Sequence, residues 1–513
     1  MNSGFDNYVV VLIGAIVLAL IVFGVAIFNG RQASWSLVLK YLRKRRIAWV
    51  SLVAVMLCTT MVLVVISIMG GWLRMFKESF HGLGGDLIVD SRSLSGFAHY
   101  DEMIERIEAL PEVAAAAPTI QTFGLLKINN QRPGAVQVMG YQMDRITKVN
   151  DFRKSLYRQY QEPVDEEKKK PEEVAPPSFA LVPDVDYDEI AKFRMPKAKN
   201  YKNWPGMIVG AGVVGIGKDK TGKVTGREGL LDASARLEVL GIKEDMTSLQ
   251  GATPTPNFYW IVDDSRTQLW QFDAKTVYVP FDILQKDLGM HRRELENPDT
   301  KEKIVEPART SSINIKVKPG TDLLKAKEKV IQVVAEWYPM VLEPDGPIGV
   351  ETWEESNATW IGAVEKEKGL VTFLFAMISI VAIFLIFCIF YMIVVEKTKD
   401  IGIIKSVGSS STGVAGIFLG YGLAIGIVGS MMGLLLGWLI VRYINEIHTW
   451  LGKTTGLIIW NPEVYAFDTI PNTMNPHEVF WIVVIAIASS VLGALVPAIR
   501  AARMNPVEAL RWE

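Results

Sequence analysis

The chain is dominated by long apolar runs that are separated by stretches of mixed polar and apolar residues. Four of these runs reach the length of about 20 residues that a helix needs to cross the hydrocarbon core of a membrane. They cover residues 47–72, 370–395, 412–442 and 479–499. The pattern therefore predicts a polytopic α-helical membrane protein with four core spans.

A fifth apolar run, residues 8–28, carries no charged side chain. A cleaved signal peptide is one interpretation of such a run at the start of a chain. However, residues 1–7 contain no Lys or Arg, the run is longer than the apolar core of a typical signal peptide, and no convincing cleavage site follows. We therefore predict that residues 1–30 form an additional, uncleaved transmembrane anchor.

The basic residues near the ends of the runs predict the orientation of the helices. Membrane proteins carry an excess of Lys and Arg in the short loops on the cytoplasmic side. Here these residues gather in segments 31–46, 396–411 and 500–513. By contrast, residues 1–7 have none and the loop 443–478 has only Lys453. We expect an inner (cytoplasmic) membrane protein with its N-terminus and residues 73–369 outside and its C-terminal tail in the cytoplasm.

The outside segment 73–369 alternates strand and helix patterns, which predicts a large α+β domain. Predicted strands cover 86–90, 122–128 and 313–317, and predicted helices cover 100–110 and 322–337. These elements suggest one subdomain assembled from both ends of the segment, with residues 208–280 forming a second. Between the two subdomains lies an insert that covers residues of about 150–205. Its segment 161–177 is rich in charged residues and proline and is expected to be mobile. Alternatively, this segment is an arm that binds a partner.

Composition narrows the possible partners and chemistry. The net charge of -1 argues against nucleic acid, because a surface that follows phosphates needs an excess of basic residues. The two cysteines, Cys58 and Cys388, lie in apolar runs, so neither a disulfide framework nor a Cys-rich metal site is expected. The five histidines are scattered without metal-ligand spacing. No catalytic residue and no metal ligand is predicted.

Two glycine-rich stretches resemble nucleotide-binding loops without meeting their requirements. Residues 210–215 match G-x-G-x-x-G after a short strand, but Gly217 and charged residues follow where a helix should open. Residues 217–224 resemble a Walker A loop, but Val224 stands where a hydroxyl group must hold magnesium. Both patterns predict tight turns, so any ATP is expected to be hydrolysed by another chain.

The loop 396–411 between two spans reads EKTKDIGIIKSVGSSS and predicts a short helix with a charged start. Its apolar positions are Ile401, Ile403, Ile404 and Val407, and Gly408 with the following serines ends the pattern. Such a helix suits docking in a groove on a soluble partner, and a plain connection between the spans is the alternative. The segment 31–46 predicts a second cytoplasmic element, a basic amphipathic helix on the inner membrane surface, or else a basic loop.

Sets of glycines four residues apart recur along the span 412–442. They are Gly416 and Gly420, Gly422 and Gly426, and Gly429, Gly433 and Gly437. Small residues at this spacing let helix backbones approach closely in lipid, which predicts a tight helix–helix or subunit interface. Ordinary glycine enrichment of membrane helices is the alternative. No span has an Asp, Glu, Lys or Arg at its centre, which disfavours an ion or proton pathway.

Several segments along the chain together carry a family pattern. They are residues 36–46, 66–72, 352–368, 395–411, 464–471 with 475–479, and 497–503 with 505–511. These segments resemble the permeases of the FtsX/MacB-type ABC family, and within it the LolC/LolE lipoprotein-releasing subunits. The segment 395–411 is the most specific match, to the family's coupling segment. Residues 464–479 resemble LolC/LolE more than MacB. The extra run at 8–28 and the middle of the outside segment do not match the family pattern.

The resemblance implies an FtsX-like permease domain over residues 370–508 and a MacB-like periplasmic core outside the membrane. It implies a homodimer, or a heterodimer with a paralogue, bound to two ABC ATPase subunits that hold ATP and Mg, with no cofactor on this chain. Movement of the ATPases would enter through the coupling segment and be relayed to the outside domain. The implied coupling residues are Glu396, Lys397, Lys399, Asp400, Ile401, Gly402, Ile403, Lys405 and Gly408.

In LolC/LolE-like systems the cargo is a lipoprotein, which is extracted from the membrane and handed to a periplasmic carrier. The resemblance therefore implies contact with membrane lipid, a lipoprotein and such a carrier. Two alternatives stay open on the sequence alone. One is MacB-like efflux of peptides or small molecules, and the other is FtsX-like regulation of a cell-wall hydrolase without transport.

Overall fold

The structure is a computed structural model that describes residues 46–511 apart from 92, 94, 129–131, 162–176, 184, 195–200, 219–223, 226–233, 241–253, 268–269, 297–302, 342–347, 456–469 and 471. The chain divides into two compact units. The helical unit contains residues 1–75, 362–457 and 470–513, and the sheet unit contains residues 76–361 and 458–469. Four predicted features lie largely or wholly outside the described residues. They are the anchor 1–30, the basic helix 31–46, the charged centre of the insert and the segment 464–471.

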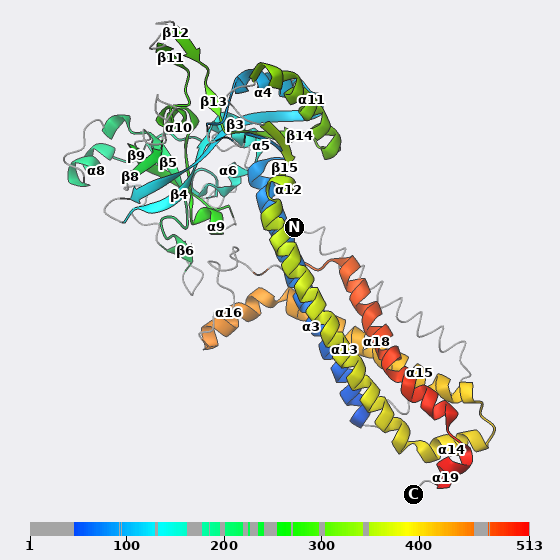
Figure 1. Ribbon diagram of the computed structural model, residues 1–513. Coiled ribbons are helices and arrows are strands. Elements are labelled where there is room, and N and C mark those ends of the chain that lie inside the picture. The colour runs from blue at the N-terminus through cyan, green and yellow to red at the C-terminus, as the bar shows by residue number, and fades with distance from the viewer. Residues whose placement is uncertain are drawn as a thin grey trace. The chain divides into compact units, whose positions relative to one another are not determined.

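Four long apolar helices build the described part of the helical unit (Figure 1). They are α3 (Arg46–Gly84), α13 (Ala358–Glu396), α15 (Ser411–Arg442) and α18 (Pro476–Arg503). All four are long and apolar enough to cross a membrane, which confirms the predicted core spans. Helices α3 and α13 have 39 residues each, so both continue beyond the predicted spans into the sheet unit. The shorter helices are α14 (Thr398–Ser406), α16 (Ile444–Thr455) and α19 (Pro506–Arg511).

Capping side chains determine where two of the long helices begin. Ser410 precedes α15, and its hydroxyl oxygen accepts a hydrogen bond from the amide of Gly413 at 3.1 Å. Asn475 precedes α18 and accepts from the amide of His477 at 3.1 Å, with Pro476 at the first helical position. Both arrangements satisfy amide groups that have no partner inside the helix.

A nine-stranded sheet forms the centre of the sheet unit. Its strands are β1 (Leu87–Ser91), β3 (Val113–Ile128), β4 (Gly134–Tyr141), β5 (Gly206–Gly210), β8 (Ser234–Leu240), β9 (Pro254–Ser265), β10 (Thr276–Pro280), β14 (Ser312–Val317) and β15 (Ile348–Thr352). The order is β15-β1-β14-β3-β4-β10-β5-β9-β8, and β8 pairs with β3 as well. Strands β3, β4, β10, β5, β9 and β8 therefore close into a ring.

Strand β3 is long enough to pair with different strands along its two halves. Its first half pairs with β14, from Val113 to Thr119, whereas its second half pairs with β8, from Gly124 to Ile128. The predicted subdomain from both ends of the segment is present in β1, β3, β14 and their helices. The predicted second subdomain is not a separate sheet, because its strands pair with β3 and β4.

The remaining elements of the sheet unit surround this sheet. The helices are α4 (Tyr100–Glu108), α5 (Met143–Val149), α6 (Phe152–Ser155), the π-helix Tyr157–Gln161, α8 (Tyr187–Arg194), the 3-10 helix Tyr201–Asn203, α9 (Trp270–Asp273), α10 (Phe281–Asp287), α11 (Leu323–Val341) and α12 (Trp353–Ser356). The short strands are β2 (Phe97–Ala98), β6 (Gly217–Lys218), β7 (Val224–Thr225), β11 (Arg293–Glu296), β12 (Lys303–Glu306) and β13 (Arg309–Thr310). Figure 1 shows α4 and α11 side by side.

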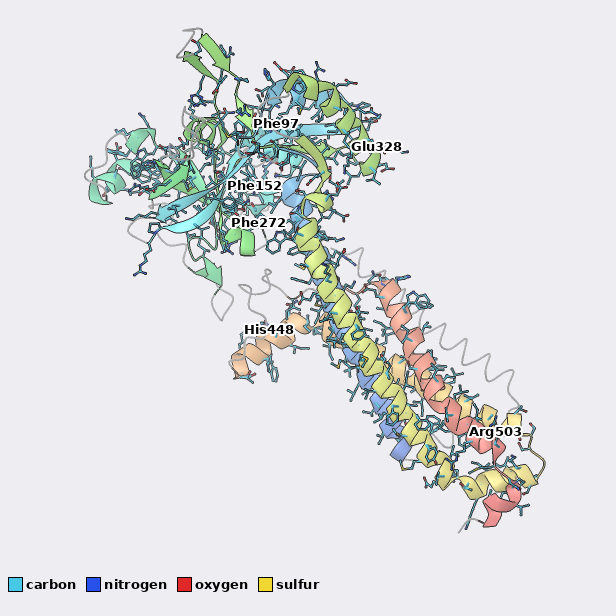
Figure 2. All side chains as sticks on the ribbon, viewed as in Figure 1. Phe97, Phe152, Phe272, Glu328, His448 and Arg503 are labelled. Carbon is cyan, nitrogen blue, oxygen red and sulfur yellow. The ribbon has the colours of Figure 1, made fainter. Side chains whose placement is uncertain are left out.

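Among the described residues of the sheet unit, two buried clusters form its core. The larger one includes Leu237, Tyr259 and Val277 of the strand ring together with residues of α4 and α11. The second includes Tyr278 and Phe152, whose ring centroids lie 4.4 Å apart. Figure 2 shows Phe152 inside the sheet unit and Glu328 on the outside of α11. The start of the predicted insert 150–205 thus belongs to the core, because α6 supplies Phe152.

The end of α3 is joined to the sheet through Gly85 and Asp86. Gly85 has φ +81°, and a Cβ at this position would lie 3.0 Å from the carbonyl oxygen of Ile315, so a glycine is needed. Asp86 follows with its side chain mostly buried, and it accepts hydrogen bonds from His81 at 2.5 Å and from the amide of Val317 at 2.7 Å. Lys316 lies 3.3 Å from the same carboxylate.

These partners predict a pH dependence of stability. Burial raises the pKa of Asp86, but the hydrogen bonds from His81 and Val317 and the charge of Lys316 outweigh it and hold the pKa below its ordinary value of 3.8. A lowered carboxyl pKa adds stability above the ordinary value, and this stability is lost as the pH falls through the folded-state pKa. Thermal unfolding of the full chain should therefore show a stability gap between wild type and Asp86→Asn that closes below about pH 4. A gap that stays constant down to about pH 3 would contradict this account.

Candidate functional site

Helix α14 carries most of the predicted coupling residues and lies between α13 and α15 in the chain. Figure 1 shows it beside α19 at one end of the helical unit. Arg503, at the adjacent end of α18, is labelled in Figure 2. Three ends of helices therefore meet at α14, and the contacts among them decide which of its side chains face outward.

One side of α14 is part of the core of the helical unit. Ile401 is 3% exposed, and Gly402 beside it is also buried. The Ile401 side chain shares an apolar cluster with Val394 of α13, Val414 of α15 and Ala501 of α18. This cluster ties α14 to three of the four long helices.

Lys405 of α14 adds a hydrogen-bonded contact to the C-terminal end of α18. The ammonium group of Lys405 donates to the carbonyl oxygens of Ala502 at 2.8 Å and Met504 at 2.7 Å. Carbonyl groups at a helix C-terminus lack partners within the helix and carry partial negative charge, so a lysine is favoured there. Three residues further on, Gly408 ends the segment with φ +101°, in the left-handed conformation typical of helix C-termini.

The opposite side of α14 is exposed, and we call it the outer face of α14. It consists of Lys399, Ile403 and Ser406 together with Val407, the C-cap residue that directly follows the helix. Their spacing of four, three and one residues places them on one side. Ile403 is 53% exposed and Val407 is 85% exposed. The structure therefore divides the predicted apolar stripe, because Ile401 and Ile404 pack inward while Ile403 and Val407 point outward.

The charged residues at the start of the segment lie beside this face. The ammonium group of Lys397 forms an ion pair with Asp400 one turn away. Glu396 and Lys399 are exposed. Sequence reasoning placed Lys405 among the coupling residues, but its ammonium group binds the backbone of this chain. It missed Thr398, which is buried and donates to the carbonyl oxygen of Val395 at 2.8 Å.

The predicted interface glycines lie at contacts between helices of the same chain. A Cβ on Gly426 would lie 3.0 Å from the Ser490 side chain of α18, and one on Gly422 would lie 2.6 Å from Ala494. The hydroxyl of Ser490 also donates to the carbonyl oxygen of Gly422 at 2.8 Å. Along these contacts α15 and α18 run antiparallel, because higher numbers on one helix meet lower numbers on the other.

Further along α15 the glycines contact α3 instead. A Cβ on Gly429 would lie 2.9 Å from Val55, one on Gly433 would lie 2.7 Å from the carbonyl oxygen of Met56, and one on Gly437 would lie 2.9 Å from Leu63. Gly433 also accepts a hydrogen bond from the hydroxyl of Thr60 at 3.0 Å.

The predicted glycine set is not uniform at its start. Gly416 is exposed and has open space where a Cβ would stand, whereas Gly420 is partly buried. Gly422 to Gly437 therefore provide the close packing of α15, and Gly416 does not contribute to it.

The loop after β5 is a tight turn, as predicted for residues 210–215. Cβ atoms at Gly210 and Gly212 would lie 2.2 Å and 2.7 Å from the backbone of Asp273 and Ala274. The amide of Val213 donates to the carbonyl oxygens of Gly210 at 2.9 Å and Asp273 at 3.1 Å. The close packing of both glycines against protein backbone accounts for their presence in this turn. Within the Walker A-like stretch 217–224, residues 219–223 lie outside the described residues.

The segment that builds this site is similar to a known protein family. Residues 372–506, which contain α14, α15, α18 and most of α13, match the model of the FtsX-like permease C-terminal family. The chain carries an FtsX-like permease domain. The predicted domain covered residues 370–508, and the outer face of α14 lies within the matched region.

Two relatives of this permease domain are named lipoprotein-releasing system transmembrane protein LolC. The chain is 31% identical over 169 residues to that of Xylella fastidiosa strain Temecula1, covering 33% of this chain and 41% of the relative. It is 31% identical over 166 residues to that of Neisseria meningitidis serogroup B, covering 32% and 40%. The match therefore spans about two fifths of the length of these relatives.

A comparison with solved structures pairs the chain with the periplasmic region of MacB from Actinobacillus actinomycetemcomitans. The TM-score is 0.26 at 8% sequence identity, covering 54% of this chain and 92% of that chain. Four helices among the described residues are long and apolar enough to cross a membrane, and three of them lie wholly or partly in the matched region. Both observations support a multi-pass membrane protein.

The glycine contacts of α15 predict a position-dependent cost of adding one methyl group. Gly433→Ala should destabilise the helical unit by about 1–3 kcal/mol, because the new Cβ overpacks the contact with Met56 and Thr59. Gly416→Ala is the matched control on the same helix and should leave stability unchanged or raise it by up to about 1 kcal/mol, because its Cβ meets open space and alanine favours the helix. Thermal unfolding of the purified chain in detergent measures both. Equal effects of the two substitutions would mean that α15 does not pack closely on α3.

Proposed function

We propose that this chain is the membrane subunit of an ABC complex in which a separate ATPase moves α14. ATP and Mg are held by the ATPase subunits, of which the complex contains two, and two permease chains form its membrane part. The C-terminus lies in the cytoplasm and the sheet unit lies outside. The match to the FtsX-like permease family and the similarity to LolC proteins support this assembly.

The observation that carries the proposal is the division of α14 into a buried and an exposed side. Large apolar side chains on an exposed helix face are typical of a surface that a partner covers. Here Ile403 and Val407 are exposed at the centre of a face that also holds Lys399. This face enters a groove on the ATPase, where apolar burial supplies affinity and the lysine supplies orientation.

The buried side of α14 explains how movement of the ATPase reaches the membrane helices. Ile401 packs on α13, α15 and α18, and Lys405 binds the end of α18. A displacement of α14 therefore moves these helices with it, since close-packed interiors transmit strain. Coupling of this kind requires no nucleotide site and no ion pathway on the permease chain.

The proposed cargo is a lipoprotein of the inner membrane, which is released on the outer side and taken up by a periplasmic carrier. The support for this cargo is that the relatives with 31% identity are named lipoprotein-releasing proteins. Efflux of peptides or small molecules and regulation of a cell-wall hydrolase are the competing outcomes of the tests below.

The outer face of α14 predicts a selective loss of ATPase docking. Ile403→Asp combined with Val407→Asp should weaken binding of the ATPase by at least about tenfold, because two charges replace buried apolar contacts. The helical unit should stay folded, since both side chains are exposed. Co-purification and titration of the ATPase with the full chain measure the effect.

Two substitutions serve as controls for this experiment. Phe123→Asp, at a side chain on β3 that is 71% exposed, should leave binding unchanged. Ile401→Asp should lower the thermal stability of the chain, because it places a charge in the cluster with Val394. Wild-type affinity in the Ile403 and Val407 double variant would place the docking surface elsewhere.

The proposed cargo predicts a change in the distribution of lipoproteins. Depletion of this chain from its host should cause lipoproteins to accumulate in the inner membrane, because their release would stop. Fractionation of the membranes followed by detection of acylated proteins measures this. An unchanged distribution would exclude lipoprotein release and leave efflux or hydrolase regulation as the function.

A further inference from the structure

Asp86 lies where three elements of the sheet unit meet. Its carboxylate accepts a hydrogen bond from His81 on α3 at 2.5 Å and one from the amide of Val317 on β14 at 2.7 Å, and it pairs with Lys316. Its carbonyl oxygen accepts a hydrogen bond from the amide of Trp353, the first residue of α12, at 3.2 Å. The side chain therefore binds α3 and the sheet, while the backbone of the same residue binds α12.

The last turn of α3 is held in place by further contacts around Asp86. The amide of Asp151 donates to the carbonyl oxygen of Gly82 at 2.7 Å, and the side-chain amide of Asn150 donates to that of Leu83 at 2.7 Å. Carbonyl groups at a helix end need such partners, and here they come from the loop between α5 and α6. The end of α3 can therefore neither slide nor rotate without breaking hydrogen bonds to the sheet unit.

The start of α12 is fixed in a similar way. Thr352 and Glu355 form a capping box, in which the Thr352 hydroxyl accepts from the Glu355 amide at 3.2 Å and the Glu355 carboxylate accepts from the Thr352 amide at 2.7 Å. The ring of Trp353 lies 5.1 Å from that of His81. After Asn357 the chain continues as α13, so α12 is the attachment of the second long helix.

We propose that Asp86 is a positioning residue that joins α3 and the α12–α13 segment to β1 and β14, so that movement of either long helix displaces the sheet unit as one body. The inference rests on the proposed function, because it concerns how ATP-driven movement reaches the sheet unit. A charged carboxylate with several hydrogen-bond partners is suited to this role, since leaving the buried amide of Val317 without a partner is costly. The lowered pKa of Asp86 agrees with this arrangement.

The first test examines the contacts of Asp86 with α3, β14 and α12, which we call the joint. In Asp86→Asn, amide hydrogen exchange in the last turn of α3 and at Trp353 should be about tenfold faster than in wild type, with β4 and β10 unchanged. Glu354→Gln is the matched control, because it removes an exposed ion pair with Lys77, 3.5 Å apart, between the same two helices. Its exchange should equal that of wild type.

The second test examines coupling in the complete complex with its ATPase. Spin labels at Leu324 on α11 and Thr449 on α16, with Cys58 and Cys388 replaced by serine, report movement of the sheet unit. Asp86→Asn should abolish the distance change that ATP produces in wild type, while ATP hydrolysis stays within about twofold because no contact with the ATPase is lost. A purely structural role would lower both readouts together.

Each outcome of these tests decides between the proposals. Exchange that increases only at Val317, or a full ATP-dependent distance change in folded Asp86→Asn, overturns the role of Asp86. If Asp86→Asn does not fold, His81→Leu removes the α3 contact alone and should give the same uncoupling, and normal coupling there overturns the role. A distance change without any effect on lipoprotein distribution excludes the proposed cargo but leaves the joint intact.

Discussion

The close approach of α15 to α3 and α18 is the contact on which the helical unit depends. In lipid, apolar side chains gain little by meeting one another, so helices associate through tight packing and hydrogen bonds between them. Gly422 and Gly426 allow contact with α18, and Gly433 allows contact with α3. The hydroxyls of Ser490 and Thr60 add hydrogen bonds at these points. With α15 in this position, the end of α18 lies where α14 can pack on it.

The same arrangement determines which side of α14 remains for a partner. Ile401 and Lys405 face inward because the core cluster and the end of α18 hold them there. Ile403 and Val407 then have no place in the core and point outward. In the sheet unit, Asp86 joins the end of α3 to the strands. In the proposed mechanism, movement enters at the exposed apolar pair of the helical unit and is passed to the strands through this carboxylate.

Local patterns predicted much of this fold, whereas features that depend on distant contacts were not predictable. Apolar run length identified the four spans, and helical spacing identified α4 and α11. The closing of the strand ring on β3 was missed, because it depends on pairing with β8, more than a hundred residues further along the chain. The apolar stripe of α14 was recognised, but spacing alone cannot tell that Ile401 meets Ala501 while Ile403 stays exposed. The role of Asp86 was not predicted, because only His81 is close to it in sequence while its partners Lys316 and Trp353 are remote.

The most direct test of the account is site-specific photo-cross-linking in the assembled complex. A photo-reactive amino acid is placed at Ile403 or Val407 on α14 and, in a parallel sample, at Ile447 on α16, which is 44% exposed. Docking of the ATPase on the outer face of α14 predicts covalent adducts with the ATPase chain from Ile403 and Val407 and none from Ile447. Absence of an adduct from both α14 positions, in a complex that still contains the ATPase, would contradict it.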